Sequence, residues 1–228
     1  MFDKIKNKIK NKGVFGKGEY GTTWQQRTGK EQSNWYERMH NSCIPMHEDF
    51  IKYLKEFPIN TILEIGCGTG YYPIKLKEIF AERKYTGIDI SQTAIEYCKT
   101  QSNFEFICTD FLKNNLNRKF DLVYSHAVID HVYDIELFIE NIVKLSRKNA
   151  YITSYRGYFP DLKKHKMNWN DSEGSYYNDI SAKMVTQKLR DLGLEDDEFS
   201  IDSIKVASEG SDDDFQTIIK INKNEENN

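Results

Sequence analysis

Apolar residues along the chain fall into short runs with two different periodicities. Short apolar runs rich in isoleucine, valine, tyrosine and phenylalanine are typical of buried strands, and apolar positions three or four residues apart are typical of amphipathic helices. The runs predict strands over residues 60–65, 84–90, 104–110, 120–126 and 149–155, and helices over residues 45–57, 71–82, 91–101 and 134–148. Because strands and helices alternate, we predict an α/β fold in which a parallel sheet carries helices on both faces.

The end of the sequence departs from this alternation. A predicted helix over residues 181–193 is followed by two predicted strands, over residues 198–208 and 214–222, and the segment "EGSDDD" links these strands. A short turn-rich link between two strands favours an antiparallel hairpin. We therefore predict a seven-stranded, mostly parallel sheet that ends in a C-terminal antiparallel hairpin.

The N-terminal part of the chain shows neither pattern. Six lysines oppose one aspartate in residues 1–18, and three apolar residues there have helical spacing. This segment is either a solvated tail or a short basic amphipathic helix that contacts an anionic membrane surface. We treat residues 1–44 as a separate basic and aromatic segment, and we expect residues 45–228 to form the main domain.

Composition narrows the class of protein. With 228 residues and 39% hydrophobic content the chain can bury one sizeable core, and a net charge of −3 provides no basic field that would favour nucleic acid. The four cysteines form no C-x-x-C pair or His/Cys cluster, so we predict neither a metal site nor a disulfide framework. No apolar run is long enough to span a membrane and the N-terminus lacks a signal-peptide core, so we expect a cytoplasmic protein. The oligomeric state has no signature in the sequence.

One glycine-rich turn stands between a predicted strand and a predicted helix. In "ILEIGCGTGYYP", residues 62–73, glycine recurs at Gly66, Gly68 and Gly70. Glycine permits positive φ and leaves the backbone N–H groups open to a ligand. The spacing differs from the dinucleotide fingerprint G-x-G-x-x-G, whose third glycine would fall at Tyr71, and from the phosphate-binding P-loop.

Two carboxylates follow the glycine turn at matching places. Asp89 ends the second predicted strand, and Asp110 ends the third. Neighbouring parallel strands bring their carboxyl ends to the same crevice, where an acid after the second strand can accept the hydroxyls of a ribose. The sequence therefore predicts a nucleoside-containing ligand at this edge of the sheet.

These motifs together resemble those of the class I S-adenosylmethionine-dependent methyltransferase family. The resemblance rests on "ILEIGCGTG", "GIDIS", "FICTDF" and "FDLVYSHAVIDHVYD", and it covers roughly residues 45–225. It implies a Rossmann-like fold with S-adenosylmethionine as the cofactor. It places Glu64, Gly66, Cys67 and Gly68 at the methionine end, Asp89 and Ile90 at the ribose and one adenine face, Asp110 and Phe111 at the base, Ser125 under the sulfonium, and Trp24, Trp35 and Tyr36 in a lid. Two of these residues have an alternative role that involves no ligand: Cys67 as a small filler, and Ile90 as plain core.

The carboxyl end of the fourth strand is where the acceptor is expected to meet the methyl group. Alignment supplies much of the catalysis of methyl transfer, and a base helps when the acceptor must lose a proton. The stretch "YSHAVIDH" lacks the "NPPY" or "DPPY" that holds a planar nitrogen in some relatives. His126 is a candidate base, or alternatively caps a backbone carbonyl, and His131 is a second candidate that Asp130 or Asp134 could orient.

The predicted acceptor-binding residues lie in an insert at residues 156–180. The insert is rich in aromatic residues, and its segments "HKMNW" and "GSYYND" could pair as a small hairpin. Members of the resembled family commonly bind the acceptor with elements placed here, which makes Arg156, Tyr158, Trp169 and Tyr177 candidates. The alternative is a surface loop packed by its own aromatic residues.

Three functions follow from these observations. The first is a methyltransferase that acts on an oxygen or nitrogen of a small molecule such as a sugar, a lipid precursor or another metabolite. The second keeps the enzyme class but takes a protein or RNA acceptor, with residues 1–18 as a docking arm. The third is a non-catalytic module that binds S-adenosylmethionine.

Overall fold

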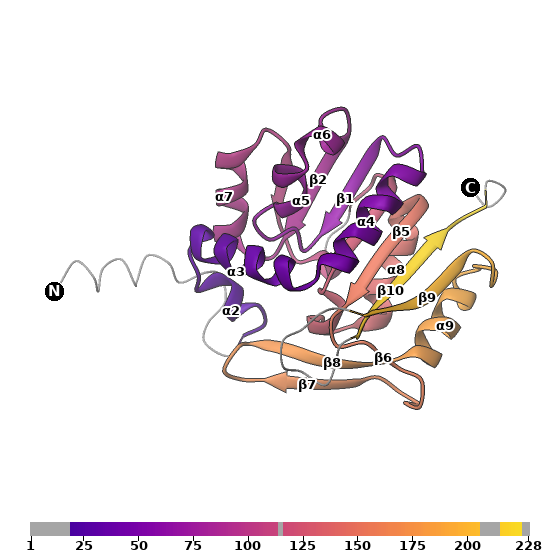
Figure 1. The fold of residues 1–228 in the computed structure, drawn as a ribbon. Helices are drawn as coiled ribbons and strands as arrows, with labels where there is room; N and C mark the ends of the chain where they lie inside the picture. Colours follow the sequence, from indigo (N-terminus) through magenta and orange to yellow (C-terminus); the bar gives the residue numbers. More distant parts are fainter. Residues whose placement is uncertain (1–18, 114–115, 206–214, 225–228) are drawn as a thin grey trace.

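A seven-stranded sheet forms the centre of the molecule (Figure 1). The structure, a computed structural model, describes residues 19–113, 116–205 and 215–224. The sheet has the order β3-β2-β1-β4-β5-β10-β9, and its strands are β1 Thr61–Ile65, β2 Lys84–Asp89, β3 Glu105–Cys108, β4 Phe120–His126, β5 Ser146–Ser154, β9 Phe199–Lys205 and β10 Phe215–Asn222. Strands β1 to β5 pair in parallel, whereas β10 is antiparallel to both β5 and β9. The predicted mostly parallel sheet with an antiparallel hairpin is confirmed.

Helices cover both faces of this sheet, with α4 in front and α8 behind in Figure 1. They are α4 Ile44–Glu56, α5 Tyr71–Lys75, α6 Lys77–Phe80, α7 Gln92–Gln101, α8 Ile135–Leu145 and α9 Ala182–Asp191. Successive residues of a strand point to opposite faces, so a central strand buried on both sides contributes to two cores. Ile62 thus joins a cluster with Phe50 of α4, while the next residue, Leu63, joins a cluster with Phe138 of α8.

Two helices depart clearly from the sequence-based prediction. The helix predicted over residues 71–82 is interrupted at Leu76, whose φ of −106° and ψ of 44° leave the helical region. Helix α8 stops at Leu145 and β5 starts at Ser146, three residues earlier than predicted. The buried hydroxyl of Ser146 donates to the carbonyl of Val143 at 3.0 Å, and Ser146 already pairs with β4, so tertiary contacts end the helix.

The insert forms a second, three-stranded sheet of β6 Tyr158–Phe159, β8 Ser175–Ser181 and β7 Lys166–Asn170. Strands β7 and β8 are antiparallel, which confirms the hairpin predicted for this segment. The buried side chain of Asn178 in β8 donates to the carbonyls of Ile129 and Val132, both at 2.9 Å. These bonds hold β8 against η2 Ile129–His131, the turn that follows β4.

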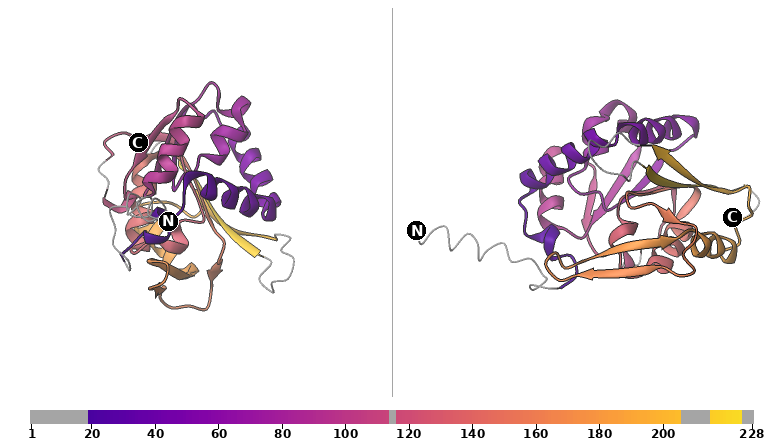
Figure 2. Two further views of the ribbon diagram at one scale, coloured as in Figure 1. Left: turned by 90° about the vertical axis from the view of Figure 1, so that its left-hand side faces the viewer. Right: turned by 60° about the horizontal axis from the view of Figure 1, so that its bottom comes forward.

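The N-terminal segment crosses from this hairpin to the edge of the main sheet, as Figures 1 and 2 show. It contains α2 Thr22–Gln25 and α3 Gly29–Ser42. The Gly21 N–H donates to the Gly174 carbonyl in the β7–β8 turn at 2.7 Å, and the Gln25 side chain donates to the Ile90 carbonyl beyond β2. The predicted basic helix at residues 1–18 lies outside the described residues, among which no helix is long and apolar enough to cross a membrane.

Candidate active site

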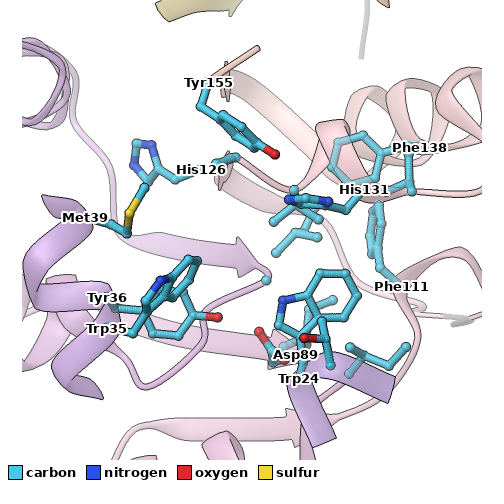
Figure 3. Close-up of a pocket in the computed structure, with 18 of the residues that line it drawn as sticks. Trp24, Trp35, Tyr36, Met39, Asp89, Phe111, His126, His131, Phe138 and Tyr155 are labelled. Carbon is cyan, nitrogen blue, oxygen red and sulfur yellow. The ribbon is translucent and has the colours of Figure 1, made fainter. Parts of the chain in front are cut away.

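A cavity of about 460 Å³ lies at the carboxyl ends of β1, β2 and β4, beneath α2 and α3 (Figure 3). Its volume is in the range of small-molecule sites. Figure 3 shows Phe111 and Phe138 on one side of the cavity, and Met39 and His126 on the other. We call the first side the Asp89 half, lined by Asp89, Ile90, Thr109, Asp110, Phe111, Leu112 and Phe138, and the second the His126 half, lined by Met39, His40, Cys43, Met46, His47, His126 and Gln216.

Asp89 is fixed by the backbone around it. Its two carboxylate oxygens accept hydrogen bonds from the N–H groups of Gly68 and Ser91, both at 2.8 Å. Burial raises the pKa of Asp89, and these backbone hydrogen bonds oppose that rise. Each carboxylate oxygen keeps a further acceptor site, so the group can receive two hydroxyls from a ligand.

Asp110 and Phe111 lie in the same half of the cavity. The Asp110 carboxylate accepts from the Leu112 N–H and from the Tyr133 hydroxyl, both at 3.0 Å. The Phe111 ring packs edge-on against Phe138, with 5.5 Å between the ring centroids. The structure therefore brings the predicted ribose acid, the predicted adenine acid and an aromatic face together.

The glycine turn is only partly open to the cavity. Gly66 lines the cavity with φ +70°, and a Cβ there would lie 2.2 Å from a methyl group of Val128. Gly68 has φ +52°, and a Cβ there would lie 2.5 Å from the ring of Tyr36 on α3. Both positions require glycine, because of the positive φ and because a neighbouring side chain occupies the space of a Cβ.

Four of the predicted cofactor residues lie behind the lining of the cavity: Glu64, Cys67, Gly68 and Ser125. The carboxylate of Glu64 accepts hydrogen bonds from Tyr124, at 2.7 Å, and Tyr85 on the α4 face. Burial is the main reason why the pKa of Glu64 rises to about 8. Cys67 is buried against Gly87, and burial raises the pKa of its thiol, which fits the small filler and not a nucleophile.

We expect Glu64→Gln to remove a pH dependence of the folding stability. The pKa of Glu64 is about 8 in the folded protein against 4.5 when solvated, so its contribution to stability is complete below about pH 4.5 and is lost as the pH rises toward 8. Over this pH interval the free energy of unfolding of the variant should therefore rise by a few kcal/mol relative to that of the wild type. Urea unfolding at about pH 5 and about pH 8 measures the difference.

A surface carboxylate provides the control for this prediction. Glu140 pairs with Lys144 and Lys188, and hydrogen bonds to these lysines lower its pKa to about 2. Glu140→Gln should therefore show no gain on the wild type between about pH 5 and about pH 8. A gap for Glu64→Gln that stays constant with pH would mean that Glu64 is ionised in the folded protein.

His126 belongs to an aromatic cluster. Its Nδ1 lies 3.3 Å from the Thr153 hydroxyl, and its ring centroid lies 4.7 Å from Phe50 and 4.8 Å from Tyr72. Burial, with smaller effects from His47 and His40, holds the pKa of His126 well below its usual value. The imidazole is therefore neutral and a weak proton acceptor.

His131 is held by the backbone of the insert. Its Nδ1 lies 2.8 Å from the Tyr176 carbonyl oxygen, and because a carbonyl only accepts, Nδ1 carries a proton. The imidazole lines the cavity among aromatic rings, with ring centroids 5.4 Å from Trp24, 5.6 Å from Tyr155 and 5.3 Å from Tyr177.

Neither Asp130 nor Asp134, the carboxylates that could orient His131, hydrogen-bonds to its ring. Asp130 accepts hydrogen bonds from the Ser154 hydroxyl at 2.5 Å and from the N–H groups of Tyr155 and Arg156 at 3.3 Å. Asp134 caps α8 by accepting from the Leu137 N–H at 2.9 Å. Both carboxylates thus serve backbone turns, and the Tyr176 carbonyl orients the imidazole.

Of the four predicted acceptor residues, Tyr177 lies in the cavity lining. Arg156 pairs with Asp179 on β8 at 2.6 Å. Tyr158 packs against the core cluster on the α8 face. Trp169 points outward, 37% exposed, and its indole N–H donates to Asp171 at 2.6 Å.

Several lining residues escaped the sequence analysis, among them Arg27, Met39, His40, Met46, His47 and Tyr155. The guanidinium of Arg27 lies 5.0 Å from the Trp35 ring centroid. Most of the group belongs to α3 and the first turn of α4, whose apolar spacing indicates only which face is buried. No cluster of three or more His, Cys, Asp or Glu side chains among the described residues could hold a metal ion.

Comparison with known sequences places the chain in a family. Residues 58–220 match the model of a family described as a methyltransferase domain. The malonyl-[acyl-carrier protein] O-methyltransferase of Acetivibrio thermocellus is 37% identical over 86 residues, which cover 36% of this chain and 30% of that protein. The ribosomal protein L11 methyltransferase of Dictyoglomus turgidum is 29% identical over 106 residues, which cover 45% and 33%. The matched stretch thus spans about a third of the length of these relatives.

Solved structures share the fold over nearly the whole chain. The plantazolicin methyltransferase BpumL, in complex with a pentazolic desmethylPZN analog and SAH, has a TM-score of 0.62 at 15% identity and covers 98% of this chain and 100% of its own. Magnesium protoporphyrin IX methyltransferase from Synechocystis PCC 6803, with bound SAM, has a TM-score of 0.58 at 16% identity and covers 97% of each chain. The family model matches more than half of the chain, and the sheet has the fold that the sequence motifs predicted. The chain therefore belongs to the class I S-adenosylmethionine-dependent methyltransferase family.

Proposed function

We propose that this protein transfers the methyl group of S-adenosylmethionine to an oxygen atom of a small-molecule acceptor. The observation that carries the proposal is the imidazole of His131, which lines the cavity and whose Nδ1–H is held by the Tyr176 carbonyl. A positioned imidazole base matters for a hydroxyl, which must lose its proton during transfer. The curated relatives named O-methyltransferases also support oxygen as the accepting atom.

The residues of the Asp89 half support its assignment as the cofactor subsite. The Asp89 carboxylate has free acceptor sites for the two ribose hydroxyls, and Asp110 and Phe111 provide a hydrogen-bond acceptor and a ring face for the adenine. The backbone of Gly66, which lines the cavity, would lie at the methionine end. When bound, S-adenosylmethionine supplies a methyl group on a positively charged sulfur with a neutral leaving group.

Residues of the protein would carry out the proton transfer and the positioning of the acceptor. Nε2 of His131 would accept the hydroxyl proton, while the Tyr176 carbonyl holds Nδ1–H and stabilises the imidazolium that forms. The rings of Trp24, Tyr155 and Tyr177 exclude water from the imidazole. Alignment of the acceptor oxygen with the methyl carbon supplies the rest of the barrier reduction.

A protein acceptor is the second candidate. It is favoured by the relative named ribosomal protein L11 methyltransferase. The cover of α2 and α3 over the cavity favours a small acceptor, or a small acyl group carried on a protein, over a folded protein surface.

Two measurements test the proposed function. Isothermal titration should detect binding of S-adenosylmethionine and S-adenosylhomocysteine. The full chain, incubated with a metabolite extract and a labelled methyl donor, should then produce a labelled small molecule that mass spectrometry identifies as a methyl ether or ester. If the protein did not bind the cofactor at millimolar concentration, the proposed enzymatic function would be rejected. If the label were found only in protein, a protein acceptor would be favoured.

A further inference from the structure

Three histidines and a tyrosine form one continuous arrangement in the His126 half. The ring of His40 stacks on Tyr71 with 3.7 Å between centroids, and on His47 with 4.3 Å between centroids and 11° between planes. His47 in turn lies 6.2 Å from His126. All three histidines line the cavity, so the stack forms a wall of its far end.

The Nδ1 atoms of these histidines are occupied by the protein. Nδ1–H of His40 donates to the Tyr36 carbonyl at 2.8 Å, which leaves a lone pair on Nε2. Nδ1 of His47 bonds to the Tyr72 hydroxyl. Nδ1 of His126 lies 3.3 Å from the Thr153 hydroxyl, whose oxygen accepts the Ala127 N–H at 3.2 Å. Because Nδ1 is the acceptor within reach of the hydroxyl hydrogen, we assign the proton of His126 to Nε2.

The Nε2 atoms of the same three histidines, in contrast, have no partner among the described residues. Those of His40, His47 and His126 are buried and have no hydrogen-bond partner within the part of the chain that the structure describes. Unpaired buried polar atoms cost free energy, and three of them in one cavity wall call for an explanation. A ligand that enters between these rings would satisfy at least one acceptor, on His40, and one donor, on His126.

The chemistry of this wall selects for an uncharged partner. Burial lowers the pKa of His40 to about 4 and that of His47 to about 3, so both rings are neutral near pH 7. The nearby acid Asp49 is engaged with the Tyr151 hydroxyl and the Lys220 ammonium, each at 2.9 Å. Met39 and Met46 complete the wall with thioethers, which make favourable contacts with aromatic rings.

We propose that the His126 half is the acceptor subsite and that it binds a flat, uncharged aromatic or heteroaromatic ring that both donates and accepts hydrogen bonds. The ring contacts Met39, donates to Nε2 of His40 and accepts from Nε2–H of His126. A ring held there presents its hydroxyl toward His131 across the cavity. This inference rests on the proposed function and names the class of its acceptor.

The test compares three bicyclic probes on the full chain saturated with S-adenosylhomocysteine. The probes are 7-hydroxyquinoline, the anion naphthalene-2-carboxylate and the saturated alcohol decahydro-2-naphthol, and titration calorimetry gives the dissociation constants. We expect 7-hydroxyquinoline to bind about tenfold more tightly than either of the others, as one or two additional neutral hydrogen bonds allow. Equal or tighter binding of the carboxylate overturns the proposal.

Variants locate the site of binding. His40→Phe keeps the stacked ring and removes the Nε2 acceptor, so it should weaken 7-hydroxyquinoline binding about tenfold without changing the affinity for S-adenosylhomocysteine. His47→Phe keeps a ring that makes no hydrogen bond to the probe, so it should bind the probe nearly as the wild type does. His165→Phe, outside the cavity lining, is the matched control and should bind the probe as the wild type does. Unchanged probe binding by His40→Phe overturns the proposal.

Failure of this inference is distinguishable from failure of the proposed function. If S-adenosylhomocysteine binds and 7-hydroxyquinoline does not, the acceptor class alone is wrong. If S-adenosylhomocysteine does not bind, the proposed function fails, and the same three probes are then compared on the free protein. If His40→Phe or His47→Phe does not fold, the relative affinities of the three probes for the wild type still test the proposed acceptor class.

Discussion

Replacing His131 by glutamine is expected to lower kcat by about 10²- to 10⁴-fold, the usual contribution of a positioned general base. Glutamine keeps an amide N–H that can donate to the Tyr176 carbonyl, but it provides no basic nitrogen where Nε2 stood. The affinity for S-adenosylhomocysteine should remain that of the wild type. Methyl transfer to the acceptor found in the extract screen gives kcat, and titration calorimetry gives the affinity.

Two further histidines serve as comparisons for this prediction. His126→Gln should act mainly on KM, because the low pKa of His126 makes it a poor base and its ring lies in the His126 half. His165→Gln should have little effect, because Nδ1 of His165 accepts the Ser181 N–H away from the cavity lining. A larger loss of kcat for His126→Gln than for His131→Gln would return the role of base to His126.

The sequence was sufficient for the parts of the site that depend on local pattern. A strand followed by an acid places that acid at the carboxyl edge of a parallel sheet, and Asp89 and Asp110 lie in the cavity for this reason. The glycine spacing likewise marks the turn after β1, where φ is positive at Gly66 and Gly68. Strand order and glycine conformation follow from rules that require no knowledge of side-chain packing.

Side-chain direction at the ends of strands was not predictable in the same way. Residues of β1 alternate between the two faces, so Glu64 turns toward Tyr85 and Tyr124 on the α4 face and does not reach the cavity. The same alternation in β4 places His126 on the face of Tyr124, inside an aromatic cluster. Motif resemblance identifies the loop, but the pleat of each strand decides which side chains face the ligand.

The positions of the remaining site residues depend on contacts between distant parts of the chain. The role that we propose for His131 depends on the Tyr176 carbonyl, 45 residues further along the chain, and on the hold of Asn178 on η2. Neither contact has a sequence signature, since the hairpin in the insert predicts pairing of β7 with β8 and says nothing of what β8 packs against. The stack of His40 and His47 depends in the same way on the angle between α3 and α4.

Replacing Asp89 by asparagine is expected to weaken binding of S-adenosylhomocysteine about a hundredfold. The neutral amide loses charge-assisted hydrogen bonds to two ribose hydroxyls, and one of its two polar atoms can no longer accept a hydrogen bond. The N–H groups of Gly68 and Ser91 also compete for the single remaining acceptor, which loosens the glycine turn. Titration calorimetry measures the affinity, and thermal unfolding measures the stability that is lost with it.

Asp121→Asn separates the ligand effect from the structural one. The Asp121 carboxylate accepts the N–H groups of Asn60 at 3.0 Å and Thr61 at 2.8 Å, at the opposite end of β1 from the cavity. It therefore has the same kind of backbone bonds as Asp89 without a ligand beside it, so this variant should lose stability and keep its affinity. If Asp89→Asn bound S-adenosylhomocysteine as tightly as the wild type, the ribose would have to lie elsewhere, whereas equal losses of affinity in both variants would mean that Asp89 acts only through the stability of the loop.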